Sequence, residues 1–282
     1  MLVVNHVRKD FGSVRAVSDV HFSIDDATTF GLLGPNGAGK TTTMRMILGI
    51  LVPDAGSVTW NGAAIHDESR RHFGYLPEER GIYGKMKVRE QIAYFAKLHR
   101  LREPEVSKRV DSWIERLGLN VYADRPCAEL SKGNQQKVQV ACASVHGPQL
   151  LVLDEPFSGL DPVNAEILIG VLGELKANGT TLILSSHQMW QLEELCERFC
   201  IIAGGSNRVE GTLAQLRSAW PTRVVRVGFA GTEESSEYTV PADTDFAAML
   251  REFVAKGPVT KFEALEPSLH EIYLRAIGEN AA

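Results

Sequence analysis

Three short segments of the chain combine residue types that bind phosphates and transfer phosphoryl groups. The segment GPNGAGKT, residues 34–41, fits the pattern G-x-x-x-x-G-K-[ST] in full. The segment LLVLDEP carries Asp154 and Glu155 at the end of an apolar run, and LSSHQ carries His187 in the same way. A glycine-rich loop with a lysine, a pair of acids and a histidine suit the binding and hydrolysis of a nucleoside triphosphate.

The glycine-rich segment predicts a phosphate-binding loop. Its glycines allow the backbone to wrap a phosphate chain with N–H groups, and the following helix adds the positive end of its dipole. Lys40 is expected to reach the terminal phosphates and the Thr41 hydroxyl to hold Mg²⁺. A turn that only joins a strand to a helix is the alternative, but it does not account for a complete motif. We therefore predict that ATP contacts Gly34, Pro35, Asn36, Gly37, Ala38, Gly39, Lys40, Thr41 and Thr42.

The acidic pair and the histidine predict the catalytic part of the same site. In open α/β sheets, strand ends place functional groups beside the ligand crevice. Asp154 can complete the shell of the magnesium ion, and Glu155 can polarise the water that attacks the γ-phosphate. The alternative is that both acids cap the next helix or face solvent. His187 can donate a hydrogen bond to the γ-phosphate, although a lone histidine at a strand end is often structural.

The segments around these residues predict the elements that position them. Residues 1–25 alternate in strand fashion, and TTFGLLG gives a short apolar strand before the loop. Residues 41–51 place apolar side chains on one helical face, and VPDAG ends that helix. The runs QLLVLDEP and TTLILSSH are apolar on both faces, as buried parallel strands are, and a helix around 165–177 separates them. FCIIAGGSNRVEG predicts a terminal hairpin, and TLAQLRSAW a closing helix.

Helical periods fill the region between the loop and the acidic pair. We expect an all-helical insert at about 88–147. It has two apolar stripes: Ile92, Phe95 and Leu98 form the first, and Val106, Val110, Trp113 and Leu117 form the second.

The fold class that follows is α/β. We predict a P-loop NTPase core with an antiparallel β subdomain and the helical insert, together spanning 1–220. After Trp220-Pro221 the pattern changes to short strands and two helices. Residues 221–282 therefore predict a small C-terminal α+β domain.

Composition limits the partners and the compartment. The chain has 282 residues, of which 44% are hydrophobic and 23% charged, enough for one large core and a small second domain. A net charge of −5 gives no basic face, so no nucleic acid is expected as a partner. Four cysteines without a CxxC pair indicate buried free thiols and a reducing compartment. No apolar run has the length of a signal peptide or a membrane span, so we expect a cytosolic protein.

The ordered set of segments resembles the nucleotide-binding subunit of ABC transporters over about the first three quarters of the chain. That set is GPNGAGKT, YLPEE, LSKGNQQ, LLVLDEP, SGLD and SSH. In this family ATP lies between two subunits, and the phosphate loop of one faces the signature sequence of the other. The resemblance implies that LSKGNQQ is this signature, with Ser131 and the Gly133 backbone touching the γ-phosphate bound by the partner chain.

Further roles come with the resemblance. It makes Phe11 the aromatic that stacks on adenine, Asp161 a residue of the subunit contact, and His187 a switch histidine. Phe11 has an alternative as a core residue of the early hairpin, and Asp161 as the N-cap of a helix that begins at Pro162. The expected partners are an integral membrane permease and a second ATP-binding subunit, most simply a second copy. The expected place is the cytoplasmic face of the plasma (inner) membrane, as a peripheral subunit.

Two positions depart from the family pattern. The usual signature is LSGGQ, whereas Lys132 and Asn134 replace a glycine and the glutamine here. Glu78 in YLPEE stands where the family has a glutamine that links magnesium and attacking water to the transporter. A carboxylate can still ligate the metal, so Glu78 is a candidate catalytic and metal-binding residue, with a solvated acid as the alternative.

These departures and the tail PSLHEIYLRAIG resemble the branch that serves exporters with a separate membrane subunit, such as sodium and drug exporters. In that branch the tail is a small regulatory or dimer-supporting domain. One rival function is a soluble ATPase of the same fold in translation or DNA repair. The chain has one motif set and shows no basic run or coiled-coil insert, which disfavours this rival. The other rival, a module that holds ATP without hydrolysis, is disfavoured by the intact acidic pair.

Overall fold

The computed structural model describes residues 1–79, 81–231 and 235–278. It divides the chain into two compact units, Met1–Glu210 and the residues from Gly211 onward. The sequence placed the boundary after Trp220 instead. The short helix α8 (Leu213–Ser218), expected to close the first domain, therefore lies in the second unit.

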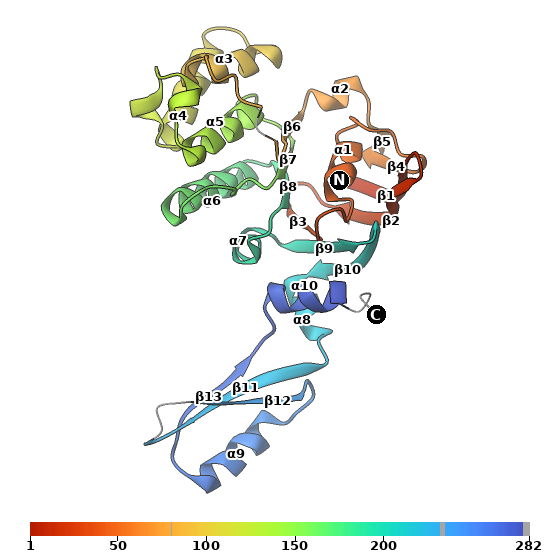
Figure 1. Cartoon of the computed structure of the whole chain (residues 1–282), viewed down its shortest axis with the longest axis vertical. Helices are drawn as coiled ribbons and strands as arrows, with labels where there is room; N and C mark the ends of the chain where they lie inside the picture. Colours follow the sequence, from red (N-terminus) through yellow and green to blue (C-terminus); the bar gives the residue numbers. More distant parts are fainter. Residues whose placement is uncertain (80, 232–234, 279–282) are drawn as a thin grey trace. The chain divides into compact units, whose positions relative to one another are not determined.

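Within the described residues, the first unit holds one ten-stranded sheet (Figure 1). Its spatial order is β5-β4-β1-β2-β10-β9-β3-β8-β7-β6. The strands are β1 (Leu2–Phe11), β2 (Val14–Ile24), β3 (Thr29–Leu33), β4 (Ala55–Trp60), β5 (Ala63–Ala64), β6 (Phe73–Leu76), β7 (Leu150–Asp154), β8 (Thr181–Ser185), β9 (Arg198–Ala203) and β10 (Ser206–Thr212).

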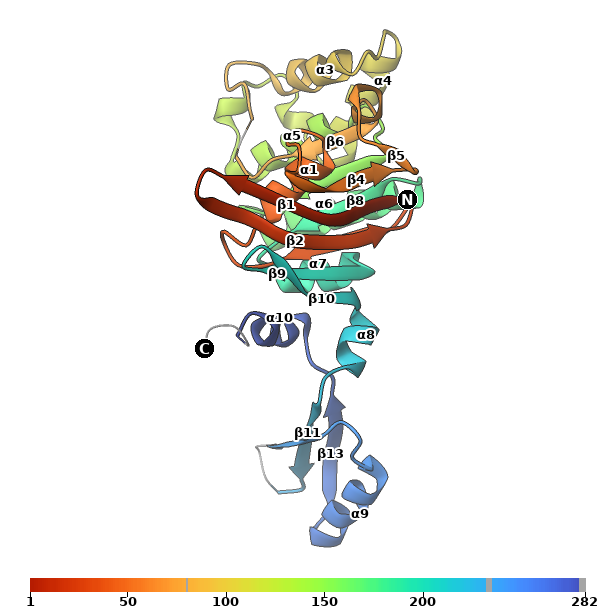
Figure 2. The ribbon, with the colours of Figure 1, turned by 90° about the vertical axis from the view of Figure 1, so that its right-hand side faces the viewer.

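One half of this sheet is parallel and the other half antiparallel. Strands β3, β8, β7, β6 and β9 pair in parallel, and every residue of β3, β7 and β8 is buried, as their unbroken apolar runs predict. The register sets Asp154 opposite Ser185 at the carboxyl ends of β7 and β8. Strands β1, β2, β4 and β5 pair antiparallel and form the second half, which Figure 2 shows from its face.

Helices surround the parallel half and form the predicted insert. In the first unit they are α1 (Lys40–Ile47), α2 (Asp67–Arg70), α3 (Val88–Leu98), α4 (Glu105–Arg116), α5 (Lys132–Ser144), α6 (Pro162–Ala177) and α7 (Met189–Leu195). Two 3-10 turns, Asn120–Tyr122 and Cys127–Glu129, join α4 to α5. Figure 1 shows α3, α4 and α5 gathered at the end of this unit that lies away from β1 and β2. The helical character of 88–147 is thus confirmed.

Two details of the sequence prediction were wrong. Helix α1 ends at Ile47 and not at Leu51, because Gly49 adopts a φ of +65° and the N–H of Leu51 turns back to the carbonyl of Arg45. In the insert, the stripe on α4 is buried, but Leu98 at the end of α3 is 58% exposed. The helical period places Leu98 in line with Ile92 and Phe95, but α3 ends at Leu98, and none of the described elements buries this side chain.

The second unit has its own small core. Strands β11 (Thr222–Phe229), β12 (Ser236–Pro241) and β13 (Val259–Leu265) form an antiparallel sheet in the order β12-β11-β13. Helix α9 (Phe246–Lys256) covers one face, where Phe253 packs with Val225 and Val227. Helix α10 (Leu269–Gly278) packs with α8.

All four cysteines are free and buried, as the sequence predicted. Among the residues that the structure describes, no helix has the length and apolar character needed to cross a membrane.

Candidate nucleotide-binding site

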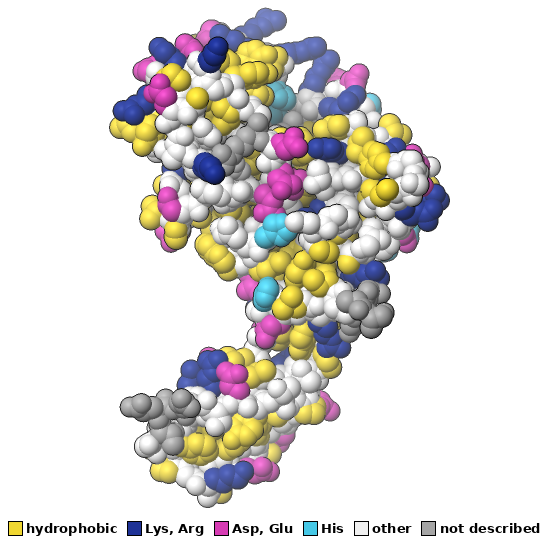
Figure 3. Space-filling view, viewed as in Figure 1, with side chains coloured by type: hydrophobic (Ala, Val, Ile, Leu, Met, Phe, Trp, Pro, Cys, Tyr) yellow, Lys and Arg dark blue, Asp and Glu magenta, His cyan; other side chains and the backbone are white. Residues whose placement is uncertain are grey.

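A cavity of about 460 Å³ lies at the carboxyl ends of the parallel strands in the first unit. Seven of the residues predicted to contact ATP line it. The four acidic and histidine side chains predicted to bind metal or take part in hydrolysis line it as well. The lining residues are Val14, Arg15, Ala16, Asn36, Gly37, Ala38, Gly39, Lys40, Thr41, Thr42, Glu78, Asp154, Glu155 and His187. Figure 3 shows acidic side chains gathered over the middle of this unit, where Figure 1 draws the ends of β6, β7 and β8.

The phosphate loop is shaped by glycines that the local backbone requires. Gly39 adopts a φ of +100° as N-cap of α1, and a Cβ there would lie 2.6 Å from the carbonyl oxygen of Ala16. This close approach brings β2 against the loop, which explains why residues 14–16 line the cavity although the sequence did not predict them. The open N-terminus of α1 supplies unpaired N–H groups and the positive dipole end for an anion.

Lys40 lies across its own loop. Its Nζ donates to the carbonyl oxygens of Gly34 at 2.6 Å and Pro35 at 3.2 Å. Gly34 and Pro35 therefore hold the ammonium group and do not line the cavity themselves. Burial lowers the pKa of Lys40, while the nearby carboxylates of Glu155, Asp154 and Glu78 raise it.

Asp154 is held by two hydroxyl groups. Thr41 Oγ1 donates to its Oδ2 at 2.8 Å, and Ser185 Oγ donates to its Oδ1 at 2.5 Å. A buried carboxylate oxygen beside a hydroxyl oxygen is the hard oxygen set that Mg²⁺ prefers, so these residues fit the predicted metal ligands. Ser185 also accepts from the backbone N–H of Glu155 at 3.1 Å, a link that the sequence analysis missed.

Glu155 and His187 form a pair on the wall of the cavity. The Glu155 side chain is 13% exposed, and its Oε1 lies 3.4 Å from Nε2 of His187. The backbone N–H of His187 donates to Oε2 of the same carboxylate at 3.3 Å. Burial raises the pKa of Glu155, and His187 acts against this shift. A carboxylate with a raised pKa is a better proton acceptor from water than an exposed one.

The alternatives for the acids are resolved by their positions. Neither Asp154 nor Glu155 caps a helix, because α6 begins at Pro162 and its N-cap is Asp161. Glu78 is exposed, as its alternative required, yet it follows β6 and lines the same cavity. His187 is also exposed, with 53% of its side chain accessible.

The segment LSKGNQQ begins helix α5 and lies outside this cavity. Ser131 is its N-cap and accepts from the N–H of Asn134 at 3.3 Å. Gly133 is buried, and a Cβ there would lie 3.3 Å from the carbonyl oxygen of Gly159. The Gln136 side chain donates to the carbonyl oxygen of Pro156 at 3.0 Å, so α5 is tied to the turn after the acidic pair.

Phe11 and Asp161 also lie outside the cavity lining. Phe11 ends β1 and is 48% exposed, so its alternative as a core residue is wrong. Asp161 accepts from the N–H of Asn164 at 2.9 Å, and this hydrogen bond lowers the pKa of its carboxyl group. The N-cap interpretation of Asp161 is therefore confirmed, and its predicted subunit contact stays a prediction.

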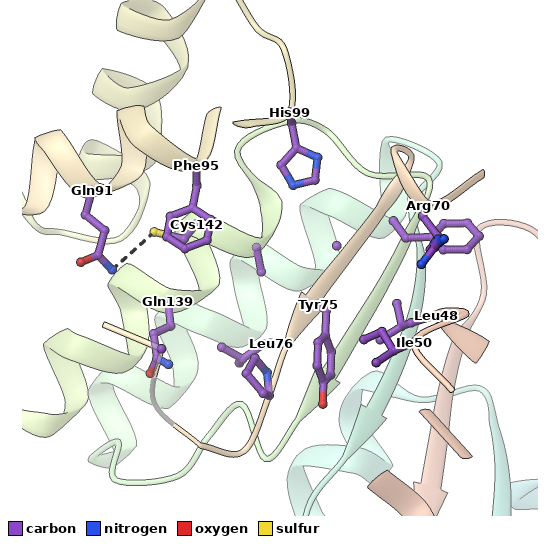
Figure 4. A pocket seen from close by; sticks show the side chains of 15 residues that line it. Leu48, Ile50, Arg70, Tyr75, Leu76, Gln91, Phe95, His99, Gln139 and Cys142 are labelled. Carbon is purple, nitrogen blue, oxygen red and sulfur yellow. Dashed lines mark hydrogen bonds between the residues drawn. The ribbon is translucent and has the colours of Figure 1, made fainter. Parts of the chain in front are cut away.

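A second cavity of about 340 Å³ lies where the helical insert meets the sheet (Figure 4). Leu48 and Ile50 lie on one side of it, and Gln91, Phe95 and Cys142 on the other. The Gln91 amide donates to Cys142 Sγ at 3.9 Å. Pro77 and Gly81 line this second cavity, and Glu78, which lies between them in the sequence, lines the first. The segment 77–81 therefore contributes to both cavities.

Comparison with known proteins gives concordant matches. A family model described as "ABC transporter" matches residues 17–158. The "Uncharacterized ABC transporter ATP-binding protein YhaQ" of Bacillus subtilis (strain 168) is 41% identical, over 99% of both chains. The "Nod factor export ATP-binding protein I" of Rhizobium sp. (strain N33) is 37% identical, over 73% of this chain and 69% of its own. A solved structure, "Structure of ATP binding subunit of ABC transporter", aligns with a TM-score of 0.75 and 28% identity, over 98% of this chain and 99% of its own.

Proposed function

Because this chain belongs to the ABC transporter family as an ATP-binding and ATP-hydrolysing subunit, we propose that two copies close head to tail on two ATP molecules and drive an integral membrane permease. The single observation that supports the dimer is that the proposed signature residues and the nucleotide cavity lie apart within one chain. Lys40, Thr41, Asp154, Glu155 and His187 share one cavity. The signature residues Ser131 and Gly133 are not among the described residues that line it.

The second half of the site comes from the second copy. Ser131 is exposed and is the N-cap of α5, and the N-terminus of this helix is the positive end of its dipole, which favours an anion. A γ-phosphate held by Lys40 of one copy meets this helix end of the other. Since each γ-phosphate is then bound by both chains, ATP favours the closed dimer over separate subunits by its differential affinity. Hydrolysis removes the shared group and reopens the dimer.

Within the part of the site that one chain contributes, each group of residues has its own role. The phosphate loop and Lys40 hold the triphosphate, and Thr41 and Asp154 hold Mg²⁺, which neutralises charge on the phosphates when bound. Glu155 accepts a proton from the attacking water, and His187 orients the Glu155 carboxylate and contacts the γ-phosphate. Phe11 stacks on the adenine ring. It is exposed at the end of β1, and residues 14–16, at the start of β2, line the cavity.

Mixed dimers test the head-to-tail arrangement. Ser131→Arg blocks the signature of one chain, and Lys40→Ala removes the phosphate contact of the other. Each variant alone is expected to lose ATP hydrolysis. A doubly tagged, purified mixed dimer recovers one intact site of two, and therefore about half of the wild-type rate. A confirmed mixed dimer without any activity would contradict the shared site.

The permease docks on the surface from Glu78 to Met86 and the adjoining cavity; Arg80 within that stretch lies outside the described residues. Two observations support this place. The cavity is open and apolar, with Ile50 exposed on its rim. Tyr83 and Tyr94 are 52% and 40% exposed and pack edge to face at 5.8 Å beside it. Motion at Glu78 thereby links the nucleotide to the partner.

Cysteine cross-linking tests this surface. Tyr83→Cys introduces one exposed thiol, whereas burial raises the pKa of the native Cys142, Cys196 and Cys200 thiols and keeps them unreactive. A cross-linker with a maleimide at one end and a photoreactive benzophenone at the other, attached at position 83 and irradiated, should join the chain to an integral membrane protein in native membranes. Val121→Cys, which is 72% exposed and outside the cavity, is the matched control. Equal cross-linking from both positions would argue against the docking surface.

We assign the direction of transport as export, because a relative named for Nod factor export is 37% identical to this chain. The subunit is peripheral on the cytoplasmic face of the membrane and is held there by its permease. The C-terminal domain proposed at 221–282 has its own core around Phe253 and serves as a regulatory or dimer-supporting module.

A further inference from the structure

A cluster of two histidines and an aspartate lies on the antiparallel half of the sheet, outside both cavities described above. His6 is on β1, and Asp19 and His21 are on β2. Each offers one ligand atom, and these three atoms all lie within 4.8 Å of one another. His6 Nδ1 is 2.8 Å from Asp19 Oδ1, His21 Nδ1 is 3.8 Å from the same oxygen, and the two rings stack at 4.5 Å.

The backbone is distorted at this cluster. His6 has a φ of +48°, a left-handed conformation that is strained for a non-glycine residue. Around this residue, the pairing of β1 shifts in register with both neighbouring strands. The shift lies between Val4 and Val7 in the pairing with β2, and between Asn5 and Arg8 in the pairing with β4. Such a bulge redirects a side chain that regular pleating would place elsewhere. Here it sets His6 beside Asp19 and His21.

A glycine on the neighbouring strand accommodates the bulge. Gly56 of β4 has a φ of +78°, and a Cβ there would lie 2.2 Å from the carbonyl oxygen of His6. Any other residue at position 56 would force the bulge to flatten. Two strands thus carry local features that maintain the position of His6.

Asn207 fixes the backbone of His21, and the ring Nδ1 of His21 faces Asp19 without a hydrogen bond. The backbone N–H of His21 donates to Asn207 Oδ1 at 3.3 Å, and the Asn207 amide donates back to its carbonyl oxygen. Within the described part of the chain, its ring Nδ1 is buried and has no hydrogen-bond partner. A buried imidazole nitrogen without a partner loses the free energy that water or a ligand would supply.

From these observations we infer that His6, Asp19 and His21 bind one divalent transition-metal ion of the zinc class. Two imidazoles and a carboxylate are ligands for Zn²⁺, Co²⁺ or Ni²⁺, and not for Mg²⁺, which prefers an all-oxygen set. Three protein ligands leave one position of a tetrahedral ion for water.

The ligand atoms need only small adjustments: His6 Nδ1 and Asp19 Oδ1, now 2.8 Å apart, must separate slightly, and His21 Nδ1 must move closer to both. Tetrahedral zinc with bonds of about 2.1 Å holds its ligand atoms about 3.4 Å apart. The side chains of His6, Asp19 and His21 are 62%, 52% and 46% exposed, so rotations in solvent can close the remaining distance. The ion would join β1 to β2 and stabilise the hairpin whose far end forms the wall of the nucleotide-binding cavity.

The competing explanation is a simple ion pair between Asp19 and a protonated His6. It accounts for the 2.8 Å contact. It does not account for the second histidine stacked in the same place, whose buried Nδ1 makes no hydrogen bond to any of the described residues.

Zinc titration of the full chain tests the proposal. The chain is treated with a chelator and titrated calorimetrically with Zn²⁺ in a buffer without nucleotide or Mg²⁺. We expect one ion per chain, and a loss of affinity of at least about tenfold in His6→Ala and in Asp19→Asn. His270→Ala, which removes an exposed histidine elsewhere, is the matched control and should bind as the wild type does.

A footprint on the unaltered chain avoids any folding defect of the variants. Diethyl pyrocarbonate modifies accessible imidazoles, and bound Zn²⁺ should protect His6 and His21 but not His270. Reactivity of His6 and His21 that does not change with Zn²⁺ would overturn the site. So would zinc affinity that survives His6→Ala and Asp19→Asn but is lost in His187→Ala, because the ion would then belong to the nucleotide-binding cavity.

Discussion

At the scale of single residues, Glu78 is the most unusual group in the site. It lines the cavity with Asp154 and Glu155, so three carboxylates lie where the phosphates are proposed to bind. Burial lowers the pKa of Lys40, and the charges of these three carboxylates act against that shift. A third carboxylate strengthens the binding of a cation and weakens that of the triphosphate anion.

Glu78→Gln is therefore expected to raise the Mg²⁺ concentration for half-maximal hydrolysis by roughly tenfold. The affinity for nucleotide without metal should rise at the same time, because a negative charge is removed. Steady-state hydrolysis at varied Mg²⁺ and a fluorescent-nucleotide titration measure the two effects. Glu79→Gln is the matched control, since Glu79 is exposed and not among the residues lining the cavity. Equal effects of both variants would show that Glu78 is only a solvated acid.

The sequence predicted most of the residues that meet at this cavity, because the motif and the strand ends are local patterns. It did not predict Ser185 and Gln136 as supports of the acidic pair. Ser185 reaches Asp154 across 31 positions, and Gln136 reaches Pro156 across 20. These hydrogen bonds join residues that are far apart in the sequence, so no fixed spacing of residue types predicts them.

At the scale of elements, a histidine with a lowered pKa connects the helical insert to the sheet. His146 follows α5 and makes a 3.1 Å hydrogen bond through Nε2 to the carbonyl oxygen of Phe73 in β6. His99, which follows α3, stacks on its ring at 3.5 Å. Burial, together with the neighbouring His99, lowers the pKa of His146 to about 3.

This shift predicts acid sensitivity of the joint. The unfolded chain binds a proton at His146 near pH 6.5, whereas the folded chain does so only near pH 3, so the contribution is complete above pH 6.5 and is lost toward pH 3. Between pH 7.5 and 5 the free energy of unfolding should fall by about 2 kcal/mol from this group. Urea denaturation of His146→Gln should show a flatter pH dependence, and His270→Gln the slope of the wild type. An unchanged slope in His146→Gln would refute this assignment.

The type of each long element was predictable, and the ends were not. Strands β7 and β8 were predicted because a short, unbroken apolar run is typical of a buried parallel strand. The exposure of Leu98 was not, since burial depends on which element covers a helix end. Helix α8 was predicted as a helix but not its place in the second unit, which depends on packing against α10 and not on its own residues.

At the scale of the whole molecule, the proposed active site needs two copies of the chain. The phosphate loop and the proposed metal ligands and base share a cavity in one chain, and the proposed signature lies at the exposed start of α5. Closure on ATP should therefore be a bimolecular event that hydrolysis reverses.

The most direct test is the mass of Glu155→Gln in solution with and without Mg·ATP. Without its base the variant should bind ATP but hydrolyse it about 10²–10⁴-fold more slowly. Light scattering after size exclusion should then find 31.0 kDa without ATP and about twice that with it. Glu166→Gln, an exposed glutamate on α6, should hydrolyse ATP as the wild type does and show no lasting dimer. A Glu155→Gln chain that binds ATP and remains at 31.0 kDa would contradict the shared site.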